Sequence, residues 1–267
     1  MLLGTPGAGK STVLRYLAVE LADTMRDGRA GVDLVGWDGV TPLPVPLFCA
    51  LGRVAKGLND DPDQDFGKLV EGLLAPVEAG GLREGLAPSV LRAWRSGGAL
   101  ICLDGLDEVS SKREPTRNGA LSRRERMAAA IKQLADQVGG SRMVVTCRTR
   151  PYRDDPAWQL GEGWATREIE SFAFGQVGHF VRAWYDESCA DHAGSKGRYP
   201  LDEARRRAKR LVEELDRRPE LRKLTASPLL STMLVLLDFG GQQLPDRKVD
   251  VYDELVMLLL DRWEGVR

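Results

Sequence analysis

The feature that most constrains this chain is a glycine-rich stretch near its start. Residues 4–11 read GTPGAGKS and match the pattern G-x-x-x-x-G-K-[ST] at every fixed position. Glycines let the backbone curl so that its N–H groups point at phosphate oxygens, and a following helix adds the positive end of its dipole. Apolar residues at helical spacing predict such a helix over Lys10–Met25. The stretch therefore predicts a loop that holds nucleotide phosphates.

The residue types of this loop suit distinct contacts. Lys10 is expected to reach the β- and γ-phosphates, and the Ser11 hydroxyl is expected to bind Mg²⁺. The loop backbone and the first helical residues are expected to supply the other contacts. The predicted nucleotide-binding residues are Gly4, Thr5, Pro6, Gly7, Ala8, Gly9, Lys10, Ser11 and Thr12.

An acidic element follows the apolar run Ala99–Leu103. Asp104 comes directly after this run and is expected at the carboxyl end of a buried strand, where ligands bind in open parallel sheets. We expect Asp104 to hold Mg²⁺ through water. Asp107 and Glu108 follow within one turn of chain, so either can orient or deprotonate an attacking water. The alternative is a solvated acidic loop at the end of a strand.

Arg148 follows a second apolar run, Met143–Cys147. A polar residue that ends such a strand lies beside the nucleotide, so Arg148 is a candidate to sense the γ-phosphate or to stabilise charge during transfer. A structural salt bridge is the competing interpretation of Arg148.

Short apolar runs alternate with amphipathic stretches over about the first 170 residues. This alternation predicts an α/β fold in which helices flank a parallel sheet. The expected strands are Pro44–Leu51, Ala99–Leu103, Met143–Cys147 and Arg167–Phe172, and the expected helices are Lys10–Met25, Phe66–Val77, Pro88–Arg95 and Ser122–Val138. The polar segments Gly28–Pro42 and Ser110–Gly119 are expected to be loops.

Beyond about residue 173 the sequence predicts helices alone. They are expected at Phe174–Tyr185, Asp202–Asp216, Pro228–Phe239 and Val251–Trp263. We therefore expect a nucleotide-binding domain over residues 1–173 and a small helical domain over residues 174–267. Only Met1-Leu2-Leu3 precedes the glycine-rich loop, so the first strand is expected to be truncated, as in a fragment or a chain with a misassigned start.

Composition bears on whether the chain binds nucleic acid, spans a membrane or contains disulfides. The 38 Lys and Arg residues balance 39 Asp and Glu residues, which argues against dedicated nucleic-acid binding. No apolar stretch reaches the roughly 18 residues of a membrane span. The four cysteines are scattered, which is typical of a reduced, cytoplasmic protein.

Six segments in order resemble the NACHT family, a branch of the STAND P-loop NTPases. GTPGAGKST resembles its nucleotide loop, GGALICLDGLDEV its extended Walker B element, and VVTCRTRPY its sensor strand. The later segments are similar to its first helical domain and the helix that closes it: REIESFAFGQVGHFVRAWY, LTASPLLSTMLVLL and LPDRKVDVYDELVMLLLDRW.

The resemblance implies an ATP/ADP switch that uses Mg²⁺ and turns over slowly. Nucleotide exchange would control self-association through the NTPase domain and signalling, in bacteria often antiphage defence. Pro228 would contact the base or sugar of the nucleotide. Effector and sensor domains are expected outside this chain.

Three other functions stay open. A motor-type ATPase of the AAA+ kind usually has a catalytic Glu directly after the Walker B Asp, where this chain has Gly105. A non-hydrolysing scaffold would bind nucleotide without turnover. A small-molecule kinase needs arginines in a lid, and the candidates are expected on a solvated helix face: Arg117, Arg123, Arg124 and Arg126.

Overall fold

A computed structural model of the chain describes residues 1–58, 64–79, 86–116, 119–138, 140–189, 199–245, 247, 249–254 and 256–257. The chain divides into two compact units, Met1–Ile169 and Glu170–Arg267. Each unit has its own hydrophobic core. The assignment of these units as a nucleotide-binding domain and a separate helical domain stays a prediction.

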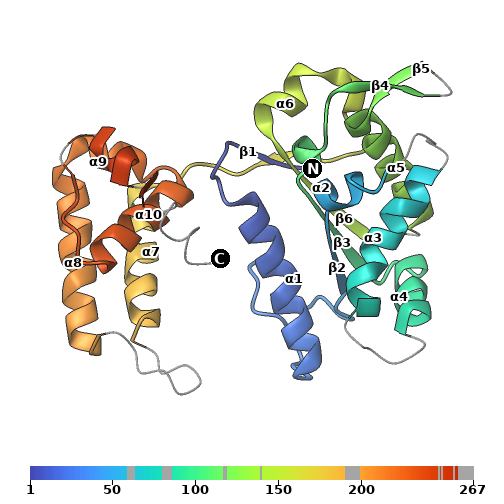
Figure 1. Cartoon of the computed structure of the whole chain (residues 1–267). Coiled ribbons are helices and arrows are strands. Elements are labelled where there is room, and N and C mark those ends of the chain that lie inside the picture. The colour runs from blue at the N-terminus through green and yellow to red at the C-terminus, as the bar shows by residue number, and fades with distance from the viewer. Residues whose placement is uncertain are drawn as a thin grey trace. The chain divides into compact units, whose positions relative to one another are not determined.

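A five-stranded parallel sheet forms the centre of the first unit (Figure 1). Its strands lie in the order β2 (Val45–Ala50), β3 (Ala99–Asp104), β6 (Arg142–Arg148), β1 (Leu2–Gly4) and β7 (Arg167–Glu168). All six residues of β3 are buried, as expected of a strand covered on both faces. The short β1 pairs with β6 on one side and with β7 on the other.

Helices cover both faces of this sheet (Figure 1). Alternate residues of β3 point to opposite faces, so Leu100 and Cys102 pack with α1 (Lys10–Arg26), whereas Ile101 and Leu103 belong to the larger core on the other side. That core is covered by α3 (Asp65–Ala79), α4 (Leu86–Arg95) and α5 (Arg123–Gln137). The predicted fold class, a parallel sheet flanked by helices and followed by a helical region, is confirmed.

The expected loop Ser110–Gly119 is wrong in part. Its described residues contribute to an antiparallel hairpin, β4 (Arg113–Thr116) and β5 (Gly119–Ser122). Each strand is too short to show the alternation that usually marks a hairpin, and β4 is charged. Two ion pairs to the next helix stabilise the hairpin. These pairs are Arg113–Glu125 at 3.0 Å and Arg123–Glu114 at 3.3 Å.

Three short helices escaped the sequence analysis because each is too brief to show a period. They are α2 (Leu51–Ala55), α6 (Thr149–Asp154) and α9 (Pro219–Leu224). The first unit also contains 3₁₀ turns at Leu106–Glu108 and Pro156–Trp158.

The second unit contains only helices among its described residues. They are α7 (Phe174–Glu187), α8 (Leu201–Arg217), α9 and α10 (Pro228–Phe239), and the described residues 249–254 and 256–257 are helical as well. Much of the expected helix Val251–Trp263 lies outside the residues that the structure describes. In the part of the chain that is described, no helix combines the length and the hydrophobicity of a membrane span.

Candidate nucleotide site

The glycine-rich loop joins the end of β1 to the start of α1. Gly7 and Gly9 have φ values of 75° and 86°, in the left-handed region that favours glycine. Gly9 is also the N-cap residue of α1, and no side chain caps the helix. Because the first turn contains no acidic residue, its free N–H groups and the positive helix end suit an anion.

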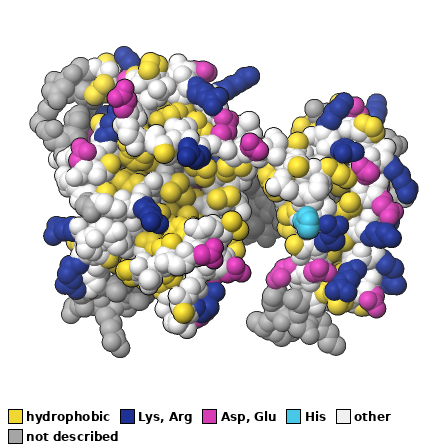
Figure 2. Space-filling view, turned by 180° about the vertical axis from the view of Figure 1, so that it is seen from behind, with side chains coloured by type: hydrophobic (Ala, Val, Ile, Leu, Met, Phe, Trp, Pro, Cys, Tyr) yellow, Lys and Arg dark blue, Asp and Glu magenta, His cyan; other side chains and the backbone are white. Residues whose placement is uncertain are grey.

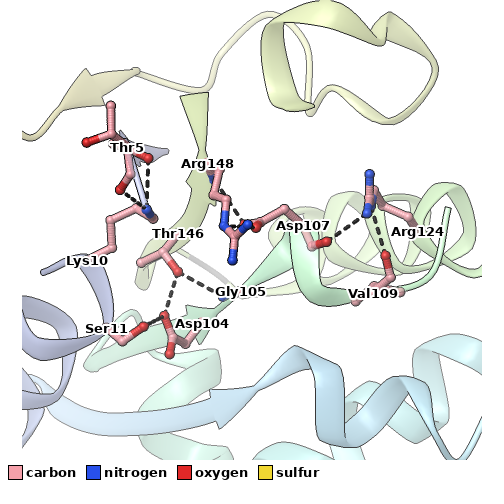
Figure 3. Close-up of polar contacts among 11 residues, drawn as sticks. Thr5, Lys10, Ser11, Asp104, Gly105, Asp107, Val109, Arg124, Thr146 and Arg148 are labelled. Carbon is pink, nitrogen blue, oxygen red and sulfur yellow. Dashed lines mark hydrogen bonds and ion pairs between the residues drawn. The ribbon is translucent and has the colours of Figure 1, made fainter. Parts of the chain in front are cut away.

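Lys10 lies back over this loop (Figure 3). Its Nζ donates hydrogen bonds to the carbonyl oxygens of Gly4 at 2.8 Å and Thr5 at 3.0 Å. Burial lowers the pKa of Lys10, and the nearby Asp107 carboxylate opposes that shift. A Cβ on Gly4 would lie 3.2 Å from the Cβ of Ala8, so the loop closes tightly on itself. Thr5, Pro6 and Thr12 are exposed.

Ser11 and Asp104 meet although 93 positions separate them in the sequence. The Ser11 hydroxyl donates to Oδ1 of Asp104 at 3.0 Å. The Thr146 hydroxyl donates to the same oxygen at 2.6 Å and accepts from the Gly105 amide at 2.8 Å (Figure 3). Thr146 therefore fixes both the carboxylate and the backbone that follows it.

The oxygen ligands in this network fit Mg²⁺. Mg²⁺ prefers hard oxygen ligands and is usually held by one or two carboxylates together with substrate phosphates and water. Asp104 and Ser11 supply one carboxylate and one hydroxyl at the edge of the phosphate loop. The described residues contain no group of three His, Cys, Asp or Glu side chains that would hold a metal without a nucleotide.

Asp107 is occupied by Arg148 in this structure. The Arg148 amide donates to Oδ1 of Asp107 at 2.9 Å, and its Nε lies 3.0 Å from Oδ2. The Asp107 side chain is only 6% exposed, whereas that of Arg148 is 51% exposed. Burial and the neighbouring Asp107 raise the pKa of Cys147 to about 12. The structural salt bridge considered for Arg148 is therefore present, and its catalytic role stays a prediction.

Glu108 has different surroundings from its neighbour. It is exposed and forms no ion pair among the described residues. Gly105, at φ 81°, lies under its side chain, and an added Cβ would come within 2.9 Å of the Glu108 Cδ. A glycine after Asp104 thus makes room for the Glu108 carboxylate.

Two residues of this site were not assigned a role from the sequence. Thr146 is a polar residue within the buried strand β6, and a polar residue inside an apolar strand is itself a signal of a buried hydrogen bond. The sequence predicts Arg124 on a solvated helix face, but its side chain donates hydrogen bonds to the backbone carbonyls of Asp107 and Val109.

The expected solvated face is wrong for Arg126 as well. The Arg126 side chain is 2% exposed and lies 2.5 Å from a carboxylate oxygen of Asp65. Helix α5 packs against α3 through this pair, which explains the burial. Arg123 pairs with Glu114, and Arg117 lies outside the described residues.

Pro228 belongs to the second unit, where it is the first residue of α10. Its predicted contact with the nucleotide stays a prediction. The other predicted residues lie in the first unit, where the structure brings together the loop, Asp104, Asp107 and Arg148 (Figure 3).

The glycine-rich loop, the buried strand that ends in Asp104 and the parallel sheet together support one assignment. The fold is that of a P-loop NTPase. Such a fold implies a bound nucleotide and usually Mg²⁺.

No protein-family model matches the chain, and no curated protein matches it. Among solved structures it is similar to the Aeropyrum pernix Orc1 protein in complex with DNA, at 17% identity and a TM-score of 0.46. The match covers 99% of this chain and 60% of that chain, so this chain spans less than two thirds of the matched protein.

The expectation of no dedicated nucleic-acid binding was wrong to rest on net charge. The matched protein is bound to DNA, and net charge describes a whole surface whereas nucleic-acid contact depends on local patches of Lys and Arg. Figure 2 shows Lys and Arg interspersed with Asp and Glu over the helical unit, at the right of the view. The balanced charge therefore does not exclude nucleic-acid binding.

Proposed function

We propose that the chain binds Mg·ATP at the glycine-rich loop and hydrolyses it to ADP and phosphate. One observation carries the proposal: the Ser11 hydroxyl lies 3.0 Å from the Asp104 carboxylate, beside a loop whose lysine and uncapped helix suit phosphate. The preference for ATP over GTP rests on the family resemblance alone.

The residues of the site divide the work of phosphoryl transfer. Lys10 and the first amides of α1 would bind the phosphates, and Ser11 with Asp104 would hold Mg²⁺. Bound Mg²⁺ neutralises phosphate charge in such sites. Because both oxygens of Asp107 are engaged by Arg148, Glu108 is the better candidate to orient and deprotonate the attacking water.

The finer proposal is a NACHT-type switch. Slow hydrolysis would leave the ADP and ATP states long-lived, so that nucleotide exchange controls self-association and signalling. The six segments that resemble the family support this proposal, and antiphage defence is the biological setting that they suggest. A motor-type ATPase and a non-hydrolysing scaffold are the competing functions.

Chromatography of the nucleotide released from the denatured, purified chain tests this proposal, together with its steady-state turnover. A switch predicts about one retained ADP per chain and slow turnover. An empty chain with brisk turnover would favour a motor-type ATPase. Retained ATP without any turnover would favour a scaffold. A chain that retains no nucleotide and shows no turnover would contradict nucleotide binding itself.

A further inference from the structure

The turn that carries Asp107 and Glu108 has little internal support. It is a 3₁₀ segment of three residues, Leu106–Glu108, between the end of β3 and a charged hairpin. Its own backbone hydrogen bonds are Glu108 N to Gly105 O at 3.0 Å and Val109 N to Leu106 O at 3.4 Å. So short a turn depends on outside contacts to keep one position.

Arg124, in the first turn of α5, supplies such contacts. Its Nη2 donates to the carbonyl oxygen of Asp107 at 2.7 Å, and its Nε donates to that of Val109 at 2.9 Å (Figure 3). Its backbone amide donates to the carbonyl oxygen of Ser110 at 3.0 Å. One residue thus binds three carbonyls within residues 107–110.

The Arg124 side chain is itself held in place. Its guanidinium lies 4.9 Å from the centre of the Trp158 ring, and Trp158 is 1% exposed. The Tyr152 ring packs edge-on against Trp158 with centroids 5.5 Å apart. Ser122 caps the helix below by accepting from the Glu125 amide at 3.1 Å.

We infer that Arg124 is a positioning residue for hydrolysis, which fixes the backbone of the turn that carries Asp107 and Glu108. Arg148 fixes the carboxylate of Asp107, whereas Arg124 fixes its backbone carbonyl. The turn is therefore held from both sides. This inference rests on the proposed function and assigns a residue that the phosphate-loop motif does not contain.

The chemistry of the side chain explains why arginine is required. Two carbonyls are bound by two different nitrogens of one planar group, which a single ammonium cannot reproduce in the same geometry. Arg124→Lys keeps the charge and loses the fork, whereas Arg124→Gln loses both. Arg123 is the matched control, because it lies in the same helical turn and pairs with Glu114 of the hairpin instead.

The test compares ATP affinity with the rate of one turnover of bound, γ-labelled ATP in the full chain. For Arg124→Gln we expect affinity within about threefold of wild type and a single-turnover rate lower by roughly 10- to 100-fold, because sub-ångström misplacement costs rate more than binding. The single-turnover rate of Arg124→Lys should lie between those of wild type and Arg124→Gln. Arg123→Gln should match wild type in both measurements.

Each other outcome counts against the inference. A purely structural role would reduce the fraction of chain that binds ATP and leave turnover per bound ATP unchanged. Equal losses in Arg123→Gln would show general damage to α5. If Arg124→Gln does not fold, a wild-type rate in Arg124→Lys contradicts the inference. If the wild-type chain binds no ATP, the proposed function is wrong. If the wild-type chain turns over ATP and Arg124→Gln turns it over at the same rate, only this inference is wrong.

Discussion

Adjacent carboxylates differ in how they are engaged at this site. Asp107 is nearly buried and accepts from the amide and guanidinium of Arg148, so its two oxygens are committed. Glu108 is exposed above Gly105 and has no ion pair among the described residues. Sequence alone left these two residues equivalent, and the structure separates them.

This difference predicts separate effects for two single substitutions. Glu108→Gln should keep ATP affinity and lower turnover by roughly 10²- to 10⁴-fold, as expected for loss of a general base. Asp107→Asn keeps its shape and some hydrogen bonding to Arg148, so its turnover should fall less. Isothermal titration with ATP and a phosphate-release assay measure both quantities. The assignment fails if Asp107→Asn is the more severely slowed variant.

At the scale of elements, α5 connects several parts of the first unit. Arg123 and Glu125 pair with the hairpin, Arg124 binds the acidic turn, and Arg126 pairs with Asp65 of α3. The polar sequence of this helix suggested a solvated face. Its arginines instead reach neighbouring elements, because their long stems can pack while their guanidinium groups find carboxylates or carbonyls.

The buried ion pair between α5 and α3 should stabilise the fold because each charge neutralises the other. In the intact pair the side chain of Arg126 is 2% exposed and that of Asp65 is 5% exposed. Arg126→Met therefore leaves the Asp65 carboxylate buried without this partner. We expect a loss of roughly 3–5 kcal/mol in the free energy of unfolding, measured by urea denaturation.

Two further variants complete this test. Arg126→Met combined with Asp65→Leu should recover most of the loss, since no charge then remains buried. Arg123→Met, at a partly exposed pair, should cost less than about 1 kcal/mol. A double variant as unstable as Arg126→Met alone would show that packing, and not the unpaired charge, determines the cost.

Local sequence patterns predicted the buried strands and longer helices well. The runs at Ala99–Leu103 and Met143–Cys147 became β3 and β6, because strands covered on both faces are apolar throughout. The hairpin was missed because each strand has only four residues, β4 carries charged residues and a proline, and β5 begins with glycine. Thr146 was missed because its partner Asp104 lies 42 positions away, and no local pattern encodes that contact.

At the scale of the whole molecule, the chain consists of two units with separate cores. The P-loop fold and the geometry around the loop belong to the first unit. The proposed switch requires the second unit to respond to nucleotide, and the family resemblance implies that Pro228, the first residue of α10, makes that contact.

The affinity of the Lys10→Ala chain for Mg·ATP tests the central claim most directly. Lys10 already lies against the loop carbonyls, where its charge is placed for phosphate, and exposed Lys132 on α5 provides the matched control. Titration should show affinity lower by at least about 100-fold in Lys10→Ala, as expected for loss of a charged phosphate contact, and unchanged in Lys132→Ala. Wild-type affinity in Lys10→Ala would contradict the assignment of this loop as the nucleotide site.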